Sequence, residues 1–330
     1  MSDFKHTHHA HCESGVISSM LTYHGFAISE PMVFGLSNAL NFAYIPFVKI
    51  GGMPLVAYRS LPKSIVKNIR KNLKIKMKME TFSSQKKGED RLDKLLEEGK
   101  IVGAQGSMYW LEYVPDELSF HFNAHNFLIY GKDEEKYLIS DPVFAEAVKC
   151  SKKSLSKSRF SKGAMAPKGL LYYPESIPKD IDLKPIIAKN IKKLSKNMLR
   201  TPVPIAGLKG LRYLAKGILK LQAKDKKYAK LFLGNIVRMQ EEIGTGGAGF
   251  RFMYASFLEE SSELFGGNAV LSDASKMMLE VGDEYREFAL VIAKSIKSKK
   301  EIDFKKISDM LFKISENEAK VYKKLLGFKA

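Results

Sequence analysis

The sequence has few cysteines and no long apolar segment. Its 330 residues include two cysteines, Cys12 and Cys150. Two cysteines are too few for the disulfide framework of small secreted domains, and they fit a reducing compartment such as the cytoplasm. No apolar run reaches the length of about 18 residues that a membrane-spanning helix needs. The polar, histidine-rich N-terminus also lacks the apolar segment of a signal peptide. We therefore expect a cytoplasmic protein without a membrane partner.

Sequence motifs for metal and nucleic-acid binding are also missing. Five of the seven histidines flank Cys12, but no second group of ligands follows at zinc-finger spacing. These five are His6, His8, His9, His11 and His24. A metal site in this cluster stays open as an alternative. No zinc finger or RNA-recognition aromatic motif is present. We expect neither a metal nor another bound cofactor.

Positive charge is concentrated in the middle of the chain. The formal net charge is +18, and between Lys149 and Gln240 there are 23 Lys or Arg residues against 4 Asp or Glu residues. Such a segment can simply be a solvated surface that keeps the protein soluble. Nucleic acid is a generic partner for this charge, but few aromatic residues are interleaved with the lysines, which argues against it. An acidic protein partner fits better, because complementary charge steers association.

One of the two cysteines has the sequence context of a nucleophile. Cys12 lies in His-Ala-His-Cys-Glu-Ser-Gly, and the apolar spacing of the segment 14–24 predicts a helix that ends at Gly25. A helix N-terminus and a nearby imidazolium both stabilise a thiolate, which is the reactive form of cysteine. The backbone N–H of Cys12 would also face a developing oxyanion. The alternative is a small buried residue without chemistry.

Two later segments supply an imidazole and a carboxylate. His125 begins a strand-like segment in Ala-His-Asn-Phe-Leu-Ile-Tyr-Gly, and Asp141 ends the next one in Leu-Ile-Ser-Asp-Pro. A thiol at a helix start, followed by these two groups on neighbouring strands, is the order found in papain-like cysteine enzymes. We expect His125 to act as base and then as acid, and Asp141 to orient the imidazole. A buried histidine and an ordinary Asp-Pro turn are the alternative.

These motifs together resemble the butirosin-biosynthesis protein H family. The histidine and aspartate motifs also look like those of C39-type peptidases, and the C-terminal part looks like the domain usually fused to the family. The segments that carry the resemblance are 11–14, 25–30, 34–36, 42–44, 125–131, 140–142 and 243–251, with Tyr254, Phe257 and Leu258. The resemblance implies transfer of an acyl group from a carrier-protein thioester to an amine. It extends to the amide-synthetase type that acts in closthioamide assembly.

The sequence departs from the peptidase pattern where the oxyanion hole forms. C39-type peptidases carry a glutamine six residues before the cysteine, and its side chain helps to form that hole. This chain has His6 at the position. We expect a ring N–H of His6 to replace the amide, and we regard His11 and Glu30 as further candidates for the oxyanion site or pocket.

A glycine-rich run in the second half of the chain is a further candidate for a pocket. It spans 244–249 and precedes Arg251 and Tyr254. No Gly-Lys-Ser/Thr ending follows and no strand precedes it, so it is not a phosphate loop. We expect Arg251 and Tyr254 to shape a substrate pocket, and a tight loop between two helices is the alternative.

The pattern of elements predicts an α+β protein in two domains. Residues 1–174 form a papain-like catalytic domain of mixed helices and strands, and residues 175–330 form a helical domain that is basic in its first part. Six segments of the second domain have helical apolar spacing. They are 184–199, 208–222, 228–243, 250–264, 268–296 and 304–326.

The predicted function is that of a cysteine acyltransferase, or amide synthetase, in natural-product biosynthesis. Cys12 would take an acyl group from a carrier-protein thioester and pass it to a primary amine. The expected partners are an acidic acyl or peptidyl carrier protein and a small amine. A thioesterase or cysteine peptidase with the same triad is one alternative. A non-enzymatic basic module that binds protein or nucleic acid is the other.

Overall fold

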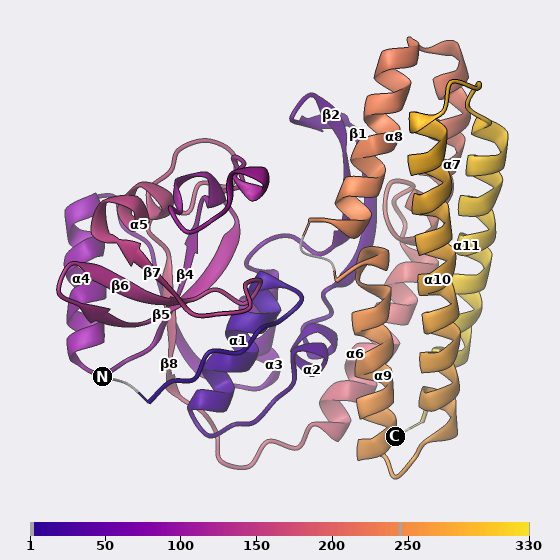
Figure 1. Ribbon diagram of the computed structural model, residues 1–330. Coiled ribbons are helices and arrows are strands. Elements are labelled where there is room, and N and C mark those ends of the chain that lie inside the picture. The colour runs from indigo at the N-terminus through magenta and orange to yellow at the C-terminus, as the bar shows by residue number, and fades with distance from the viewer. Residues whose placement is uncertain (1–2, 244–245, 330) are drawn as a thin grey trace. The chain divides into compact units, whose positions relative to one another are not determined.

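Figure 1 shows the computed structural model, which describes residues 3–243 and 246–329. The chain divides into two compact units, of which the first contains Met1–Val33 and Ile65–Ile181 and the second Phe34–Ser64 and Asp182–Ala330. The sequence-based boundary at 174/175 placed residues 34–64 in the first domain. In the structure they pack within the second unit, so the chain leaves the first unit and returns to it.

The first unit is built on an antiparallel sheet of six strands in the order β3-β8-β4-β5-β6-β7. The antiparallel pairing of its strands, with helices packed on the sheet, confirms the predicted α+β class. Its strands are β3 (Lys76–Glu80), β4 (Val102–Gly106), β5 (His125–Asp133), β6 (Lys136–Ser140), β7 (Val148–Ser151) and β8 (Leu171–Ser176). Its helices are α1 (Cys12–Tyr23), α3 (Ser64–Asn72), α4 (Gln85–Glu97), α5 (Lys152–Arg159) and the short η1 (Met108–Trp110) and η2 (Asp116–Leu118), and α2 (Glu30–Leu36) leads out of the unit.

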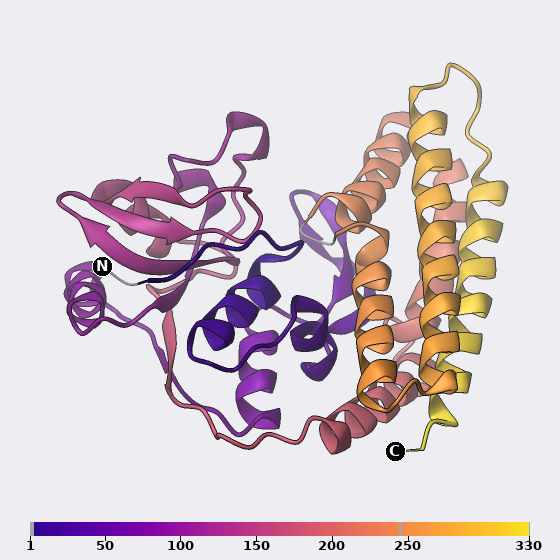
Figure 2. The same cartoon turned by 60° about the horizontal axis from the view of Figure 1, so that its bottom comes forward.

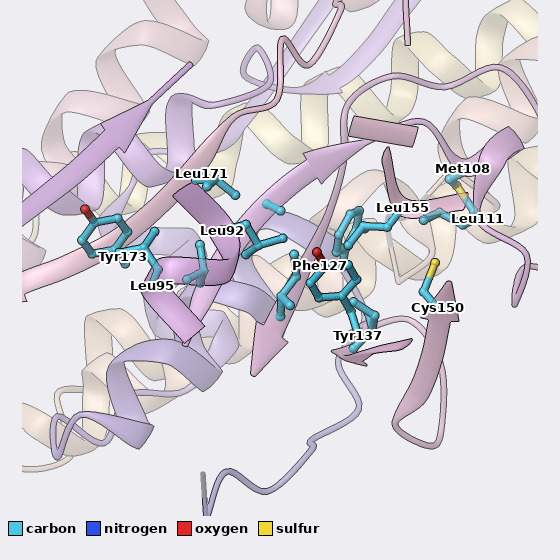
Figure 3. Close-up of a cluster of buried hydrophobic side chains, with 14 of the residues drawn as sticks. Leu92, Leu95, Met108, Leu111, Phe127, Tyr137, Cys150, Leu155, Leu171 and Tyr173 are labelled. Carbon is cyan, nitrogen blue, oxygen red and sulfur yellow. The ribbon is translucent and has the colours of Figure 1, made fainter. Parts of the chain in front are cut away.

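The sheet has an apolar face that packs against α4 and α5. Successive side chains of a strand point to opposite faces, and on this face β4 and β5 contribute Val102, Ala104, Phe127 and Ile129 to a buried cluster. Figure 3 shows Leu92 and Leu95 of α4, Leu155 and also Cys150 in the same cluster. Helix α1 also packs against β4 and β5. The residues of α1 from Cys12 to Leu21 are all buried, so this helix is covered on every side, and its first residue lies near His125 at the start of β5.

The register of β5 and β6 brings two distant residues together. The two strands form an antiparallel hairpin in which Leu128 pairs with Ser140. The start of β5 therefore lies beside the end of β6. His125 is the first residue of β5, and Asp141 directly follows β6. Their 16-residue separation in sequence thus becomes a direct contact.

The second unit contains a two-stranded hairpin and a group of long helices. The hairpin is β1 (Leu40–Ile50) and β2 (Met53–Arg59). Its helices are α6 (Lys184–Arg200), α7 (Gly207–Leu219), η3 (Lys220–Ala223), α8 (Lys226–Glu241), η4 (Ala248–Phe250), α9 (Arg251–Leu264), α10 (Ala269–Lys297) and α11 (Phe304–Leu326). Helices α9, α10 and α11 contact one another in sequence order, as Figure 2 shows. The predicted helical C-terminal part is therefore confirmed.

The hairpin joins the second unit through backbone and ring contacts. The backbone N–H of Tyr44 donates to the carbonyl of Ile205 at 2.8 Å, and Ala43 bridges to Ala206. The Tyr44 ring also lies 5.3 Å from that of Tyr213 in α7. No helix among the described residues combines the length and apolar character needed to cross a membrane.

Candidate active site

The first residue of α1 is Cys12. The residue before it, His11, has extended backbone angles and caps the helix, and the Cys12 side chain is buried with 6% of its surface exposed. The first N–H groups of a helix have no partner within the helix and carry its positive dipole. The thiol thus lies where a negative sulfur or oxygen is favoured.

The imidazole of His125 is held by a fully buried carboxylate. Its Nε2–H donates to Oδ2 of Asp141 at 2.6 Å. The same carboxylate accepts from the hydroxyl of Tyr113 at 2.9 Å and from the backbone N–H of Val143 at 3.3 Å. Asp141 has no exposed surface. The three donors fix the carboxylate, and the carboxylate fixes the tautomer of His125 so that Nδ1 is left for the thiol.

The electrostatics of Cys12 and His125 favour the charged form of both groups. Burial acts to raise the pKa of the Cys12 thiol, but the charges and hydrogen bonds of His11 and His125 outweigh it and hold this pKa well below the usual value. Burial acts to lower the pKa of His125, but Asp141 and Cys12 raise it to about 10. Both shifts favour the ion pair of a thiolate and an imidazolium.

The second cysteine has the opposite environment. Cys150 lies in the apolar cluster behind the sheet with no exposed surface (Figure 3). Burial raises the pKa of its thiol to about 11. The two cysteines thus differ in the direction of their pKa shifts as well as in position.

Glu30 organises the loop that leads into α1. One carboxylate oxygen accepts from the backbone N–H of His11 at 2.9 Å and from the hydroxyl of Ser14 at 2.8 Å, and the other accepts from the N–H of Ala10 at 2.9 Å. Burial acts to raise the pKa of Glu30, but His9, His11 and the Ala10 N–H lower it. An ionised carboxylate has no proton to donate, so Glu30 positions the loop and does not supply an oxyanion donor.

His6 is bound to the segment around Asp141. Its Nδ1 lies 2.7 Å from the hydroxyl of Ser140, and its Nε2–H donates to the carbonyl of Phe144 at 3.0 Å. Both ring nitrogens therefore have partners, and the N–H that we expected at an oxyanion is directed to Phe144. His6 ties the N-terminal segment to the end of β6 instead.

Three of the histidines around Cys12, namely His6, His9 and His11, make separate side-chain hydrogen bonds. His9 contacts Ser19 through Nε2 at 3.0 Å and lies 3.6 Å from Glu30 through Nδ1. Across residues 3–243 and 246–329, no group of three or more His, Cys, Asp and Glu side chains is arranged to hold a metal ion. Of these histidines, His6, His9 and His11 hold the segment before α1 through hydrogen bonds, and His24 is the C-cap of that helix.

Arg251 and Tyr254 lie inside the second unit. The guanidinium of Arg251 donates to Glu318 through Nη2 at 2.8 Å and Nε at 3.2 Å, and neither side chain is exposed. Tyr254 is also fully buried. Arg251 thus neutralises a buried carboxylate, and the expected role of the two residues in a substrate pocket finds no support in their burial.

The glycine run before Arg251 is partly described. Gly244 and Thr245 lie outside the described residues. Gly249 has φ +55°, and a Cβ on it would lie 2.3 Å from the Tyr58 ring. Glycine is therefore required there by a left-handed backbone and by close packing within the second unit.

Two polar residues near the site were not found from sequence. Ser14 joins Glu30 to His11, and its position three residues after the N-cap is the signal that was available. Tyr113 supports Asp141 from an irregular segment between η1 and η2, where no periodicity marks it.

Two family models match the chain. Residues 153–325, just over half of the chain, match the family described as Domain of unknown function (DUF4872). The chain belongs to the DUF4872 family. Residues 11–142 match the family described as Butirosin biosynthesis protein H, N-terminal. This second match confirms the resemblance that we predicted, and it spans Cys12, His125 and Asp141.

Individual proteins add little to the DUF4872 assignment. None of the curated proteins matches this sequence. The crystal structure of a C39-like peptidase from Bacillus anthracis is similar at 17% identity, with a TM-score of 0.37, over 54% of this chain and 98% of that one.

Proposed function

We propose that this protein is a papain-like cysteine acyltransferase that forms an amide from a carrier-protein thioester and a primary amine. The observation that carries the proposal is the Cys12 thiol at the start of α1, with a lowered pKa, next to the pair of His125 and Asp141. The match to the N-terminal part of butirosin biosynthesis protein H supports a role in antibiotic biosynthesis. A buried, inert Cys150 directs the chemistry to one thiol.

The first half-reaction loads the enzyme. The Cys12 thiolate attacks the thioester carbonyl, and the tetrahedral oxyanion faces the α1 N-terminus, where the backbone N–H of Cys12 is a donor. When the intermediate collapses, the bond from carbon to the carrier sulfur breaks. The protonated His125 gives its Nδ1 proton to that sulfur, so the products are a carrier thiol, neutral His125 and an S-acyl Cys12.

The second half-reaction forms the amide. The amine nitrogen attacks the acyl carbon of S-acyl Cys12, and neutral His125 takes one proton from that nitrogen. The carbon–sulfur bond to Cys12 then breaks and the thiolate leaves, which restores the starting ion pair. Asp141 keeps Nε2–H engaged throughout, so that Nδ1 exchanges the proton in both steps. Exclusion of water from the acyl-enzyme would separate this reaction from hydrolysis.

An acidic carrier protein is the proposed donor. The basic stretch from Lys149 to Gln240 holds most of the excess positive charge of the chain. Within it, helix α6 exposes four lysines, namely Lys189, Lys192, Lys193 and Lys196. Exposed charge of one sign speeds the encounter with a partner of the opposite sign. We propose that these four lysines, hereafter the α6 lysines, contribute to carrier docking.

The decisive experiment is the intact mass of the protein after mixing with an acyl-loaded carrier protein. The proposal predicts an added acyl mass that is absent in Cys12→Ala and that disappears when a primary amine is added, with formation of the amide. If water removes the acyl group from Cys12 faster than millimolar amine does, the protein would be a thioesterase or peptidase. If no thioester adds an acyl mass and Cys12→Ala behaves like the wild type in this assay, the protein would be a non-enzymatic binding module.

A further inference from the structure

The turn 141–144, which carries Asp141, is held by the segment that precedes α1. His6 Nδ1 lies 2.7 Å from the Ser140 hydroxyl, and its Nε2–H donates to the Phe144 carbonyl at 3.0 Å. Ser140 directly precedes Asp141 in the chain, and Phe144 closes the turn because its N–H donates to the Asp141 carbonyl at 3.1 Å. The single ring of His6 therefore bridges the two ends of this turn.

One tautomer of the neutral His6 ring satisfies both contacts. A carbonyl oxygen can only accept, so the proton that meets Phe144 lies on Nε2. The other ring nitrogen, Nδ1, then has a lone pair that accepts the hydroxyl proton of Ser140. Ser140 is buried with 1% of its surface exposed, so little water competes for this hydroxyl.

The same turn packs between the N-terminal segment and α1. The backbone N–H of His9 donates to the Pro142 carbonyl at 2.6 Å. A Cβ on Gly15 would lie 2.7 Å from the Cβ atoms of both His9 and Pro142, so any side chain there would push the turn away from the helix. Gly15 lies about one helical turn after Cys12. The segment therefore fixes the turn against the helix that carries the nucleophile.

We propose that His6 is a positioning residue, which clamps the turn 141–144 and so holds the Asp141 carboxylate in line with His125. This carboxylate accepts from Nε2–H of His125 at 2.6 Å, so a small displacement of the turn lengthens that bond. The inference rests on the proposed role of Asp141, which is to orient His125 toward Cys12.

The clamp also reaches the other donors that hold Asp141. The Phe144 ring lies edge-on to the Tyr113 ring, with 5.6 Å between their centroids, and the Tyr113 hydroxyl donates to the carboxylate at 2.9 Å. The N–H of Val143, which lies within the turn, donates to the carboxylate at 3.3 Å. A displaced turn would therefore disturb these two donors together with the bond from His125.

The competing role for His6 is to stabilise the fold without affecting the site. His6→Ala removes both side-chain bonds. A glutamine amide carries an acceptor oxygen and an N–H donor, so His6→Gln can accept from Ser140 and donate to Phe144. His8→Ala is the matched control, because His8 is an exposed histidine of the same segment.

The test follows the bond between His125 and Asp141 and the ionisation of Cys12 in the full chain. Nuclear magnetic resonance of ¹⁵N-labelled protein detects the His125 Nε2–H proton, whose signal lies at low field in so short a bond. The rate of iodoacetamide alkylation at Cys12, measured by peptide mass from about pH 4 to pH 10, gives the half-point of thiol ionisation.

His6→Ala should weaken both signatures of the site. We expect the low-field proton signal to broaden or vanish. A displaced Asp141 raises the pKa of His125 less, and a less protonated His125 lowers the pKa of Cys12 less. The half-point should therefore move upward by about one pH unit, which is a tenfold loss of thiolate at a fixed acidic pH. His6→Gln and His8→Ala should stay close to the wild type in both measurements.

The outcomes separate this inference from the proposed function. An unchanged signal and half-point in folded His6→Ala would overturn the inference, and so would equal changes in His6→Ala and His6→Gln. If circular dichroism shows that His6→Ala does not fold, Ser140→Ala removes one of the two bonds and should shift the half-point in the same direction by less; no shift there would also overturn the inference. An ordinary thiol half-point in the wild type would contradict the nucleophilic role of Cys12, and the proton signal of His125 in the variants would still decide on the clamp.

Discussion

The two cysteines should differ strongly in their reaction with iodoacetamide. The pKa of Cys150 is about 11, so roughly one molecule in ten thousand carries a thiolate there at pH 7. The pKa of Cys12 lies well below 9.0, so more than about one in a hundred is ionised. Ionisation alone thus favours Cys12 by more than about 100-fold. Intrinsic nucleophilicity falls with pKa, with a Brønsted slope of about 0.4–0.5, which leaves an advantage of at least about tenfold.

The sign of the pH dependence makes this prediction sharper. A lowered pKa keeps the thiolate present at lower pH, so alkylation of Cys12 should persist from pH 8 to pH 6. A thiol of ordinary pKa loses about 100-fold of its thiolate over the same two units. The assay is peptide mass spectrometry after brief labelling, with Cys150→Ser and Cys12→Ser as single-thiol controls. Equal rates for the two cysteines at pH 6, or a 100-fold fall at Cys12, would refute the assignment of a paired thiolate.

Three further changes probe the reaction, the docking surface and the buried ion pair. Cys12→Ala and His125→Ala should each abolish amide formation, measured as turnover. Asp141→Asn should lower turnover by less, about 10⁴-fold, because the other members of the triad remain. Equal losses of turnover in all three variants would contradict the view that Asp141 is the least essential of the three. The apparent KM for a carrier-loaded substrate should rise strongly from 0.1 M to 1 M salt, because the Debye length falls from about 10 Å to about 3 Å. Reversal of the α6 lysines to glutamate should raise this KM as well. The KM for an N-acetylcysteamine thioester should change much less in both experiments. The matched control for that reversal changes the same number of exposed lysines outside the basic stretch, Lys297, Lys299, Lys300 and Lys306, and an equal effect of both sets would exclude specific docking on α6. Arg251→Ala should lower the free energy of unfolding by about 3–5 kcal/mol in urea titration, because Glu318 is left buried without its cation. A changed KM at an unchanged free energy of unfolding would instead support a role of Arg251 in a substrate pocket.

Most helices of the chain could be predicted from the spacing of apolar residues. The apolar positions of the segment 14–24 lie on one side of α1, and the helix in the structure runs from Cys12 to Tyr23. The same holds for α10 and α11, whose buried residues recur at helical spacing. Helices α10 and α11 are recoverable because each buries one continuous apolar face, which the sequence records directly. Helix α1 is instead buried on every side from Cys12 to Leu21, and the spacing of its apolar residues alone predicted it.

Two elements were missed because their sequences carry too little apolar pattern, although β7 places Cys150 in the apolar cluster. Strand β7 (Val148–Ser151) and helix α5 (Lys152–Arg159) lie in a lysine-rich stretch. Helix α5 buries three serines beside Leu155, and Ser158 donates to the carbonyl of Ser107 at 2.9 Å. Burial through side-chain hydrogen bonds leaves no hydrophobic pattern.

The division of the chain also depended on contacts that the sequence does not record. The β1–β2 hairpin follows α2 directly, so sequence order assigned it to the first half. Its partners, Ile205 and Ala206, lie about 160 residues later. No local propensity distinguishes a strand that pairs nearby from one that packs on a distant helix.

For the candidate site, the chain order of Cys12, His125 and Asp141 carried more information than the residues around it. A strand hairpin places His125 beside Asp141 wherever the two segments pair, so order and strand pattern were sufficient. The roles of His6 and Glu30 were not predictable in the same way. A histidine or a glutamate side chain can take several hydrogen-bonding roles. Here His6 donates to the Phe144 carbonyl and Glu30 accepts from the Ala10 N–H, and these partners come close to the two side chains only in the folded chain.

In the proposed reaction, the coupling of Cys12 to His125 bears on the choice of acceptor. The pKa of His125 is raised by the buried Asp141 and also by the Cys12 thiolate. Acylation converts that thiolate into a neutral thioester and removes its contribution, so the pKa of His125 falls in the acyl-enzyme. In the proposed acyl-enzyme, His125 is therefore more readily neutral and better able to take a proton from an attacking amine. The low pKa of Cys12 also makes its sulfur a good leaving group. In this proposal the same ion pair favours loading while His125 is protonated and discharge once it is neutral, and the shape of the acceptor site selects between an amine and water.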